Sequence, residues 1–176
     1  PSVDGGLTVA RPSGSEGVPR RKTAAGKYGS YKILLVEDNL VNQTVALRML
    51  EKLGCHVRVA GNGRLALELL AGEAFDLVLM DCQMPVMDGY TATQEIRKPG
   101  TPWYHPDLPV IALTAHIGAG ELARTKDAGM NDHISKPLKS ATLDEKLALW
   151  LDVPEASEDV DAGAPGEGSA PDDGTP

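Results

Sequence analysis

The sequence predicts an α/β fold in which five helices cover both faces of a doubly wound, five-stranded parallel sheet. Two observations predict it. Short apolar runs of strand length alternate with longer amphipathic stretches through the middle of the chain. Several of these runs are apolar without interruption, as is typical of parallel strands that are buried on both faces. Because such alternation builds strand–helix–strand units, we expect one sheet with helices on both sides.

The first unit combines an apolar strand with an amphipathic helix. Residues 32–36 (Lys-Ile-Leu-Leu-Val) form the expected strand. Asn39 is a good N-cap for the helix that comes next, and Gly54 is a typical helix end. The apolar residues of this helix that we expect to face the core are Val41, Val45, Leu47, Leu50 and Leu53.

The second unit begins with an alternating strand at 56–60 (His-Val-Arg-Val-Ala). Asn62 is expected to cap a short helix that ends near Gly72. The apolar side of this helix is made of Leu65, Leu67, Leu69 and Leu70. The next run, 75–80 (Phe-Asp-Leu-Val-Leu-Met), is almost entirely apolar and predicts a strand at the centre of the sheet.

The same alternation continues to the end of the middle region. It predicts a turn at 85–89, helices at 91–98, 118–128 and 140–151, and strands at 109–113 and 133–135. Gly129 ends the second of these helices. The segment 99–108 is rich in proline and is expected to be a surface loop.

The 176-residue chain carries a formal net charge of −8, and this charge is unevenly distributed. Residues 1–30 hold five basic and two acidic side chains, whereas residues 152–176 hold eight acidic and no basic ones. Both segments are rich in Gly, Ser, Pro and Ala and lack apolar periodicity. We therefore expect a disordered linker at 1–30, one domain at 31–151 and a disordered acidic tail at 152–176.

Composition excludes several functional classes. No stretch approaches the ~20 apolar residues that span a bilayer, and the N-terminus lacks the apolar run of a secretory signal. The two cysteines are too few for a disulfide scaffold and lack zinc-ligand spacing. The acidic balance argues against nucleic-acid binding by this segment. Because the chain begins with Pro1, we expect a piece of a longer protein. We expect this piece to be cytoplasmic, whether or not the parent chain is anchored in a membrane.

Polar residues lie directly after the apolar runs, at the points where the strands end. Glu37 and Asp38 follow the first strand, Asp81 the third, Thr114 the fourth and Lys136 the fifth. Ligands of parallel α/β sheets bind beyond the carboxyl ends of the strands, so we expect all five residues at one rim. Crowded carboxylates repel one another unless a cation intervenes, and their oxygens suit Mg²⁺.

The chemistry of this set favours phosphoryl transfer. An aspartate can act as a nucleophile that holds a phosphoryl group. A metal ion and Lys136 would stabilise the charge on the oxygens of that group, while Thr114 offers a hydroxyl. Each residue alone also has an ordinary explanation, such as a helix cap or a solvated charge. Their coincidence at successive strand ends is the observation that predicts a site.

Four stretches carry a resemblance to a known family. They are 34–39 (Leu-Leu-Val-Glu-Asp-Asn), 80–89 (Met-Asp-Cys-Gln-Met-Pro-Val-Met-Asp-Gly), 112–115 (Ala-Leu-Thr-Ala) and 136–137 (Lys-Pro). In these stretches the chain resembles the receiver domain of two-component response regulators over residues 31–151. The resemblance implies the flavodoxin-like strand order 2-1-3-4-5. It also implies a module that exchanges a phosphoryl group with a histidine kinase or a histidine phosphotransfer domain.

By this resemblance Asp81 is the phosphoacceptor, and Glu37 and Asp38 form an acidic pocket. The implied Mg²⁺ ligands are Asp38, Asp81 and the backbone carbonyl of Gln83, with Glu37 acting through water. Catalysis by such a domain is limited to its own phosphorylation and dephosphorylation.

The resemblance also implies how such a domain switches. Thr114 is expected to move onto the phosphoryl oxygen and Lys136 to pair with that group, and the Lys136–Pro137 peptide bond is expected to be cis. The switch aromatic of the family, usually Tyr or Phe three residues before the lysine, is His133 here. This departure leaves open whether an aromatic swing accompanies phosphorylation.

Finer details narrow the resemblance. Four stretches, 39–42, 81–85, 113–116 and 129–133, are most like receivers fused to hybrid histidine kinases. Gln83 and His116 flank the site and either tune the attack of water on the acyl phosphate or are ordinary surface residues. Two alternatives stay open, a free-standing response regulator and a receiver-like docking module without turnover. A flavodoxin-type redox protein is disfavoured, because two acids rather than a phosphate-binding loop follow the first strand.

Overall fold

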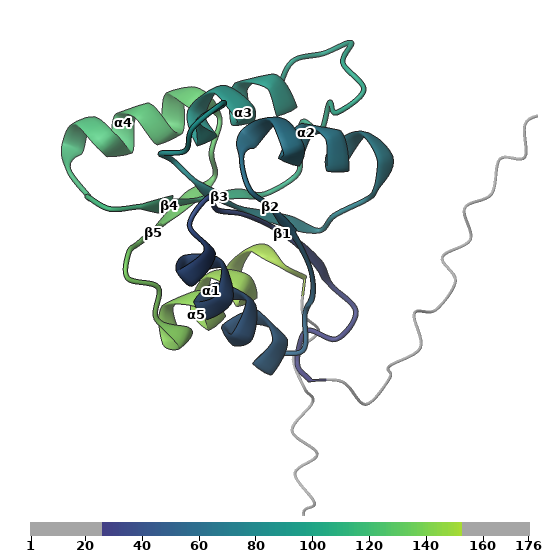
Figure 1. Ribbon diagram of the computed structural model, residues 1–176, viewed down its shortest axis with the longest axis vertical. Helices are drawn as coiled ribbons and strands as arrows, with labels where there is room; N and C mark the ends of the chain where they lie inside the picture. The colour runs from purple at the N-terminus through teal and green to yellow at the C-terminus, as the bar shows by residue number, and fades with distance from the viewer. Residues whose placement is uncertain (1–25, 153–176) are drawn as a thin grey trace, which may run out of the picture.

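Five parallel strands form the sheet of the computed structural model, which describes residues 26–152 (Figure 1). They are β1 Lys32–Val36, β2 His56–Ala60, β3 Leu77–Asp81, β4 Val110–Thr114 and β5 Asp132–Ser135. The strand order is β2-β1-β3-β4-β5, which confirms the predicted fold class and strand order. The predictions for residues 1–25 and 153–176 lie outside the described residues.

Helices alternate with the strands and cover both faces of the sheet. They are α1 Leu40–Lys52, α2 Gly63–Gly72, α3 Gly89–Ile96, α4 Ala119–Ala128 and α5 Ser140–Trp150. Figure 1 shows α2, α3 and α4 on one face and α1 and α5 on the other. Helix α3 begins earlier than the predicted residue 91, because the Asp88 side chain accepts the Thr91 amide as an N-cap. None of the helices in residues 26–152 is long and apolar enough to span a membrane.

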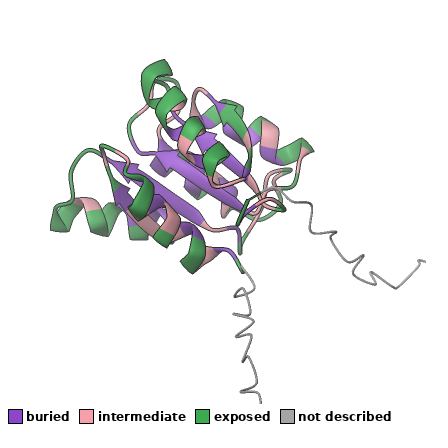
Figure 2. Cartoon of the chain, turned by 90° about the horizontal axis from the view of Figure 1, so that it is seen from below, coloured by how far each residue is buried: buried purple, intermediate pink, exposed green. Residues whose placement is uncertain are grey.

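The strands supply a core on each face of the sheet. Side chains alternate along β1, so Leu34 and Val36 belong to the cluster beneath α2 to α4, and Ile33 and Leu35 to the cluster beneath α1 and α5. Figure 2 shows the strands as the most buried part of the molecule. Full burial of one such side chain contributes about 1.5–3 kcal/mol relative to exposure. The core therefore fixes the sheet, and the sheet fixes the positions of the residues at its strand ends.

The register of the sheet aligns the carboxyl ends of its strands. Val36 at the end of β1 pairs with Met80 of β3. Thr114 at the end of β4 pairs with Ser135 at the end of β5. Residues that come directly after these pairs therefore emerge together at one edge of the sheet.

The buried side of α1 differs from the prediction. Val41 and Val45 were expected in the core but are 70% and 43% exposed. Ala46 and Leu50, which are one helical turn apart, are the buried residues of this helix. Apolar residues occur on more than one side of α1, so periodicity alone does not select the side that meets the sheet. Leu65 of α2 is similarly exposed.

The described fold begins before the predicted boundary at residue 31. Tyr28, which the sequence assigned to the linker, is fully buried. Its hydroxyl donates to the Asp144 carboxylate at 2.6 Å, and its amide donates to the Leu53 carbonyl at 3.1 Å. The turn that contains Tyr28 is thus attached to α5 and to the end of α1. The boundary of the domain is corrected to include residues 26–30.

Candidate functional site

The aligned strand ends bring the predicted residues to one cavity of about 250 Å³. Glu37, Asp38, Asp81 and Lys136 all line it. Thr114 ends β4 beside them but is not part of the cavity wall. Four of the five residues predicted from strand ends therefore face one space, and the fifth lies next to it.

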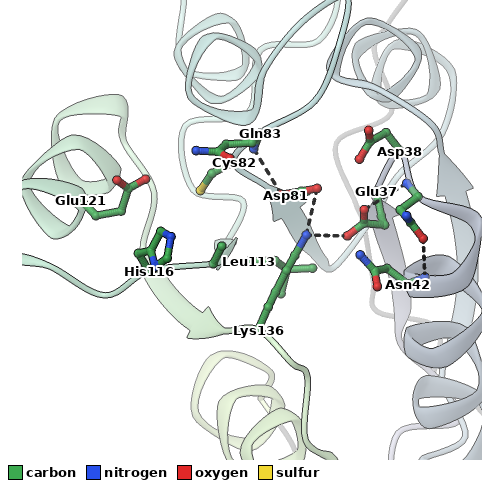
Figure 3. Close-up of a pocket in the computed structure, with 12 residues that line it drawn as sticks. Glu37, Asp38, Asn42, Asp81, Cys82, Gln83, Leu113, His116, Glu121 and Lys136 are labelled. Carbon is green, nitrogen blue, oxygen red and sulfur yellow. Dashed lines mark hydrogen bonds and ion pairs between the residues drawn. The ribbon is translucent and has the colours of Figure 1, made fainter.

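A single lysine joins two buried carboxylates in this cavity (Figure 3). The Nζ atom of Lys136 lies 2.9 Å from Oε2 of Glu37 and 3.0 Å from Oδ2 of Asp81. Glu37 and Asp81 are only 2% and 4% exposed. Buried charges are costly unless they are paired and hydrogen-bonded, so Lys136 stabilises both acids at once.

The two buried acids have different proton affinities. Burial, together with the nearby Glu37 charge, raises the pKa of Asp81 to about 6, although Lys136 and the Gln83 amide oppose the rise. Burial would also raise the pKa of Glu37, but hydrogen bonds from Lys136 and from the Asn39 amide outweigh it and keep that pKa below its usual value. The same two acids outweigh the burial of Lys136 and raise its pKa. The lysine is therefore a permanent ammonium.

Three carboxylates form a group suited to a metal ion. Oxygen atoms of Glu37, Asp38 and Asp81 all lie within 4.8 Å of one another, and Asp38 is exposed to solvent. Gln83 also lines the cavity, and its backbone amide donates to Oδ1 of Asp81 at 3.2 Å. The possible metal ligands are all oxygen atoms, and two of the acids are buried while one is open to water. Such a set fits a hard divalent cation.

The Thr114 hydroxyl is bonded to the backbone that follows β4. Its Oγ1 donates to the backbone carbonyl of His116 at 2.8 Å, within the loop that precedes α4. The side chain is 3% exposed, so this bond satisfies a buried polar group. Any contact of Thr114 with a group on Asp81 requires the hydroxyl to leave His116.

The turn after β3 approaches Asp81 so closely that only glycine fits. A Cβ atom on Gly89 would lie 2.2 Å from the Asp81 carbonyl oxygen. The Gly89 amide donates to the Cys82 carbonyl at 3.2 Å, which closes the turn. On the opposite side of the site, the Lys136–Pro137 peptide bond is cis, as expected.

Comparisons with known proteins identify the family. A family model described as the response regulator receiver domain matches residues 33–148. The chain belongs to this family. The receiver domain is 38% identical over 125 residues to hybrid signal transduction histidine kinase K of Dictyostelium discoideum, covering 69% of this chain and 10% of that protein. It is also 38% identical over 119 residues to the sensor histidine kinase GacS of Pseudomonas protegens, covering 68% of this chain and 13% of that protein.

Solved structures agree with this assignment. The receiver domain of the sensor histidine kinase PA1611 from Pseudomonas aeruginosa PAO1, with a magnesium ion in its active-site cleft, has a TM-score of 0.62 and 44% identity. The match covers 68% of this chain and 96% of that one. The chemotaxis protein CheY4 of Vibrio cholerae has a TM-score of 0.61 and 28% identity, covering 69% and 98%. The predicted resemblance to receivers of hybrid histidine kinases is confirmed, although the chain spans only 10% and 13% of the Dictyostelium and Pseudomonas protegens kinases.

Several residues of the receiver domain's cavity were not found from the sequence. Asn39, Asn42 and Glu121 line it, in addition to the predicted flanking residues Gln83 and His116. Asn39 was recognised only as a helix cap, yet its backbone amide also donates to Oε1 of Glu37 at 3.1 Å. Glu121 lies on α4, and its position in the first helical turn after the β4 strand end was the available signal.

The substituted switch position lies outside the cavity wall. His133 belongs to β5, its side chain is 31% exposed, and its Nδ1 lies 3.8 Å from the Asp132 carboxylate. Asp132 itself accepts hydrogen bonds from Lys146 and from the Trp150 indole. His133 therefore sits beside a charged junction of β5 and α5.

Proposed function

We propose that this receiver domain accepts a phosphoryl group from a phosphohistidine onto Asp81. One observation carries the proposal. The Asp81 carboxylate is buried at the floor of a solvent-connected cavity, where one oxygen is paired with Lys136 and the other with the Gln83 amide. Both hydrogen bonds orient the carboxylate, so that a phosphorus atom entering from the cavity meets a fixed nucleophile.

In the transfer, an Asp81 oxygen forms a bond to phosphorus while the bond between phosphorus and the donor's imidazole nitrogen breaks. The imidazole leaves with the electron pair of that bond. The pKa of Asp81, raised to about 6 by burial, still leaves the carboxylate mostly ionised at neutral pH. Lys136 lies within 3.0 Å of Asp81 and can follow the charge onto the phosphoryl oxygens.

The cavity's acids fit Mg²⁺ as the metal. Asp38, Asp81 and the backbone carbonyl of Gln83 would hold it, with Glu37 acting through water. Bound there, Mg²⁺ would neutralise the crowded carboxylates and the oxygens of the incoming group. The support is the group of three carboxylates within 4.8 Å and the magnesium ion in the similar PA1611 receiver.

The switch would involve Thr114 and the loop before α4. The phosphoryl group offers an acceptor stronger than the His116 carbonyl, to which the Thr114 hydroxyl is now bonded. Movement of this hydroxyl toward Asp81 would pull on the loop and so on α4. Lys136 would keep its bond to Glu37 while pairing with the new group.

The proposed partners are a histidine kinase or a histidine phosphotransfer domain, and the proposed setting is a cytoplasmic part of a hybrid histidine kinase. The similarity to the Dictyostelium and Pseudomonas protegens kinases supports this context. The alternative of a free-standing response regulator is tested by the sequence that precedes Pro1 in the parent gene. A kinase core upstream supports the hybrid, and a start codon directly upstream contradicts it.

The decisive experiment labels the chain from a radioactive small-molecule donor, phosphoramidate, in the presence of Mg²⁺. We expect acid-labile, base-labile label on the wild-type chain and none on Asp81→Asn. Asp127→Asn is the matched control, because Asp127 is an exposed aspartate of α4 outside the cavity. Undiminished labelling of Asp81→Asn contradicts the assignment. A wild-type chain that takes no label supports the docking module without turnover.

A further inference from the structure

Helix α4 begins without the side-chain cap found on the helices before it. Asn39, Asn62 and Asp88 cap α1, α2 and α3, and each accepts at least one backbone amide. The N-cap of α4 is Gly118, which has no side chain to offer. Contacts with neighbouring elements must therefore fix the first turn of α4 in place.

Tyr90 supplies such a contact. It lies in the first turn of α3 and is 7% exposed, and its hydroxyl donates a hydrogen bond to the carboxylate of Glu121 in the first turn of α4. The guanidinium of Arg124, one turn along α4, lies 4.2 Å from the centre of the Tyr90 ring. Burial, and then the bond to Glu121, raise the pKa of Tyr90, so its hydroxyl keeps the proton that it donates.

Glu121 also faces the cavity that contains Asp81. Figure 3 shows it on the side of the cavity opposite Glu37 and Asp38. Lys136 is the only lysine or arginine among the described residues that line the cavity, and it is already bonded to two carboxylates. A phosphoryl group adds about −1.5 to −2 charges. The added charge would therefore face Glu121, and no lysine or arginine of the cavity wall is free to pair that glutamate.

We propose that Tyr90 and Glu121 form a latch that holds α4 in the unphosphorylated domain, and that a phosphoryl group on Asp81 opens the latch by repelling Glu121. The proposal rests on the assignment of Asp81 as phosphoacceptor. When Glu121 turns away, its bond to Tyr90 is lost and the first turn of α4 is released from α3. Every bond that favours the latched state then lowers the affinity of the domain for a phosphoryl group.

Two substitutions separate the latch from simple packing between α3 and α4. Tyr90→Phe keeps the ring and its contact with Arg124 but removes the hydroxyl. Glu121→Gln keeps the size of the side chain but removes the charge that the phosphoryl group would repel. A purely space-filling Tyr90 predicts no effect of Tyr90→Phe on binding at Asp81, and no shift of the α4 resonances of free Glu121→Gln.

The test titrates the full chain with beryllofluoride, a phosphoryl mimic, at saturating Mg²⁺ and follows the amide resonances of α4 by NMR. We expect Tyr90→Phe to lower the midpoint on the order of threefold to tenfold, because it removes a hydrogen bond to a charged acceptor from the latched state. Before any beryllofluoride is added, its α4 resonances should already lie partway towards the bound positions of the wild type. Glu121→Gln should lower the midpoint as well. In the double variant, the midpoint should fall by less than the sum of the two single effects.

Two matched controls accompany the titration. Tyr104→Phe alters a partly exposed loop tyrosine, and Asp127→Asn alters an exposed acid of α4 outside the cavity. Both should keep the wild-type midpoint. An unchanged or raised midpoint for folded Tyr90→Phe overturns the latch. If Tyr90→Phe does not fold, free Glu121→Gln carries the test, and α4 resonances that stay at the free wild-type positions overturn the latch. A wild-type chain that does not respond to beryllofluoride overturns the phosphoacceptor assignment instead.

Discussion

The two halves of this receiver domain start their helices in different ways. In the half that carries the acids, the side chains of Asn39, Asn62 and Asp88 cap α1, α2 and α3. In the half that carries Thr114 and Lys136, the N-caps of α4 and α5 are Gly118 and Lys139, and neither makes a side-chain cap bond. A good cap stabilises a helix by about 0.5–2 kcal/mol. The helix starts in the half with the acids are therefore stabilised by their own cap residues, and those in the other half are not.

Burial separates the helices in a similar way, except that α1 of the capped half buries only two residues. Helices α2 and α3 bury four and five residues, whereas α4 and α5 bury two each. Elements with few buried apolar contacts unfold locally at a lower free-energy cost. The second half is held near the site by a set of polar contacts made at the site itself, including Thr114 with His116 and Lys136 with Glu37. A rigid half thus presents Asp81, the proposed phosphoacceptor, and a loosely held half is positioned to respond to it.

The largest effect on stability is expected from a substitution in the rigid half. Gly89→Ala should destabilise the domain by about 3 kcal/mol or more, because the added Cβ would lie 2.2 Å from the Asp81 carbonyl oxygen and backbone must shift. Labelling from phosphoramidate should fall with it, since Asp81 is displaced. Urea unfolding measures the first effect. Gly72→Ala is the control, because a Cβ there meets nothing within 4 Å. A Gly89→Ala domain as stable as the wild type would show that the turn after β3 adapts freely.

The next largest effect concerns the junction of β5 and α5. Asp132 accepts hydrogen bonds from Lys146 and Trp150 at 2.8 and 2.9 Å. Asp132→Asn should cost about 2 kcal/mol of unfolding free energy at pH 7, as expected for bonds to a charged acceptor. These bonds join β5 to α5, a helix whose N-terminus has no side-chain cap.

The cost should depend on pH in a defined direction. Burial would raise the pKa of Asp132, but the bonds from Lys146, Trp150 and the His133 amide outweigh it and lower the pKa. A carboxyl with a lowered folded pKa stabilises the domain above its unfolded pKa of about 3.9 and loses this effect as pH falls through the folded value. The difference between wild type and Asp132→Asn should therefore shrink below about pH 4. A difference that is constant from pH 7 to pH 3 would contradict the ion-pair explanation.

The rigid half was also the more predictable one. The cap residues Asn39 and Asn62 and the acids after β1 and β3 are local signals, because each depends on a residue's distance from the end of an apolar run. The register of the sheet then brings the strand ends together without further information. The site could be predicted because it is built from consecutive positions of a regular alternation.

The missed features depend on contacts between distant parts of the chain. Tyr28 lies in a Gly/Ser-rich stretch without periodicity, and its partner Asp144 is 116 residues away. Val41 was expected in the core, but the side of α1 that meets the sheet is set by packing rather than by the count of apolar residues. The contact between Tyr90 and Glu121 joins two helices whose sequences carry no sign of it.

A smaller effect compares the two kinds of helix start directly. Asn62→Ala removes the side chain that accepts the Leu65 amide at 3.0 Å and should cost about 1 kcal/mol. Gly118→Ala should cost less than Asn62→Ala, because alanine is a poorer N-cap than glycine but no side-chain cap bond is lost and a Cβ there meets nothing within 4 Å. Chemical denaturation of both variants measures the contrast. Equal costs at the two positions would remove the distinction between the halves.

The smallest effect strengthens the loosely held half. Gly120 lies in the first turn of α4, and a Cβ there also meets nothing within 4 Å. Gly120→Ala should stabilise the domain by about 0.5 kcal/mol, because alanine has the higher helix propensity and loses less backbone entropy on folding. If the first turn of α4 loosens during switching, the same variant should also bind beryllofluoride slightly more weakly. A gain in stability with an unchanged beryllofluoride midpoint would mean that this turn stays helical in both states, so that α4 moves as a rigid body.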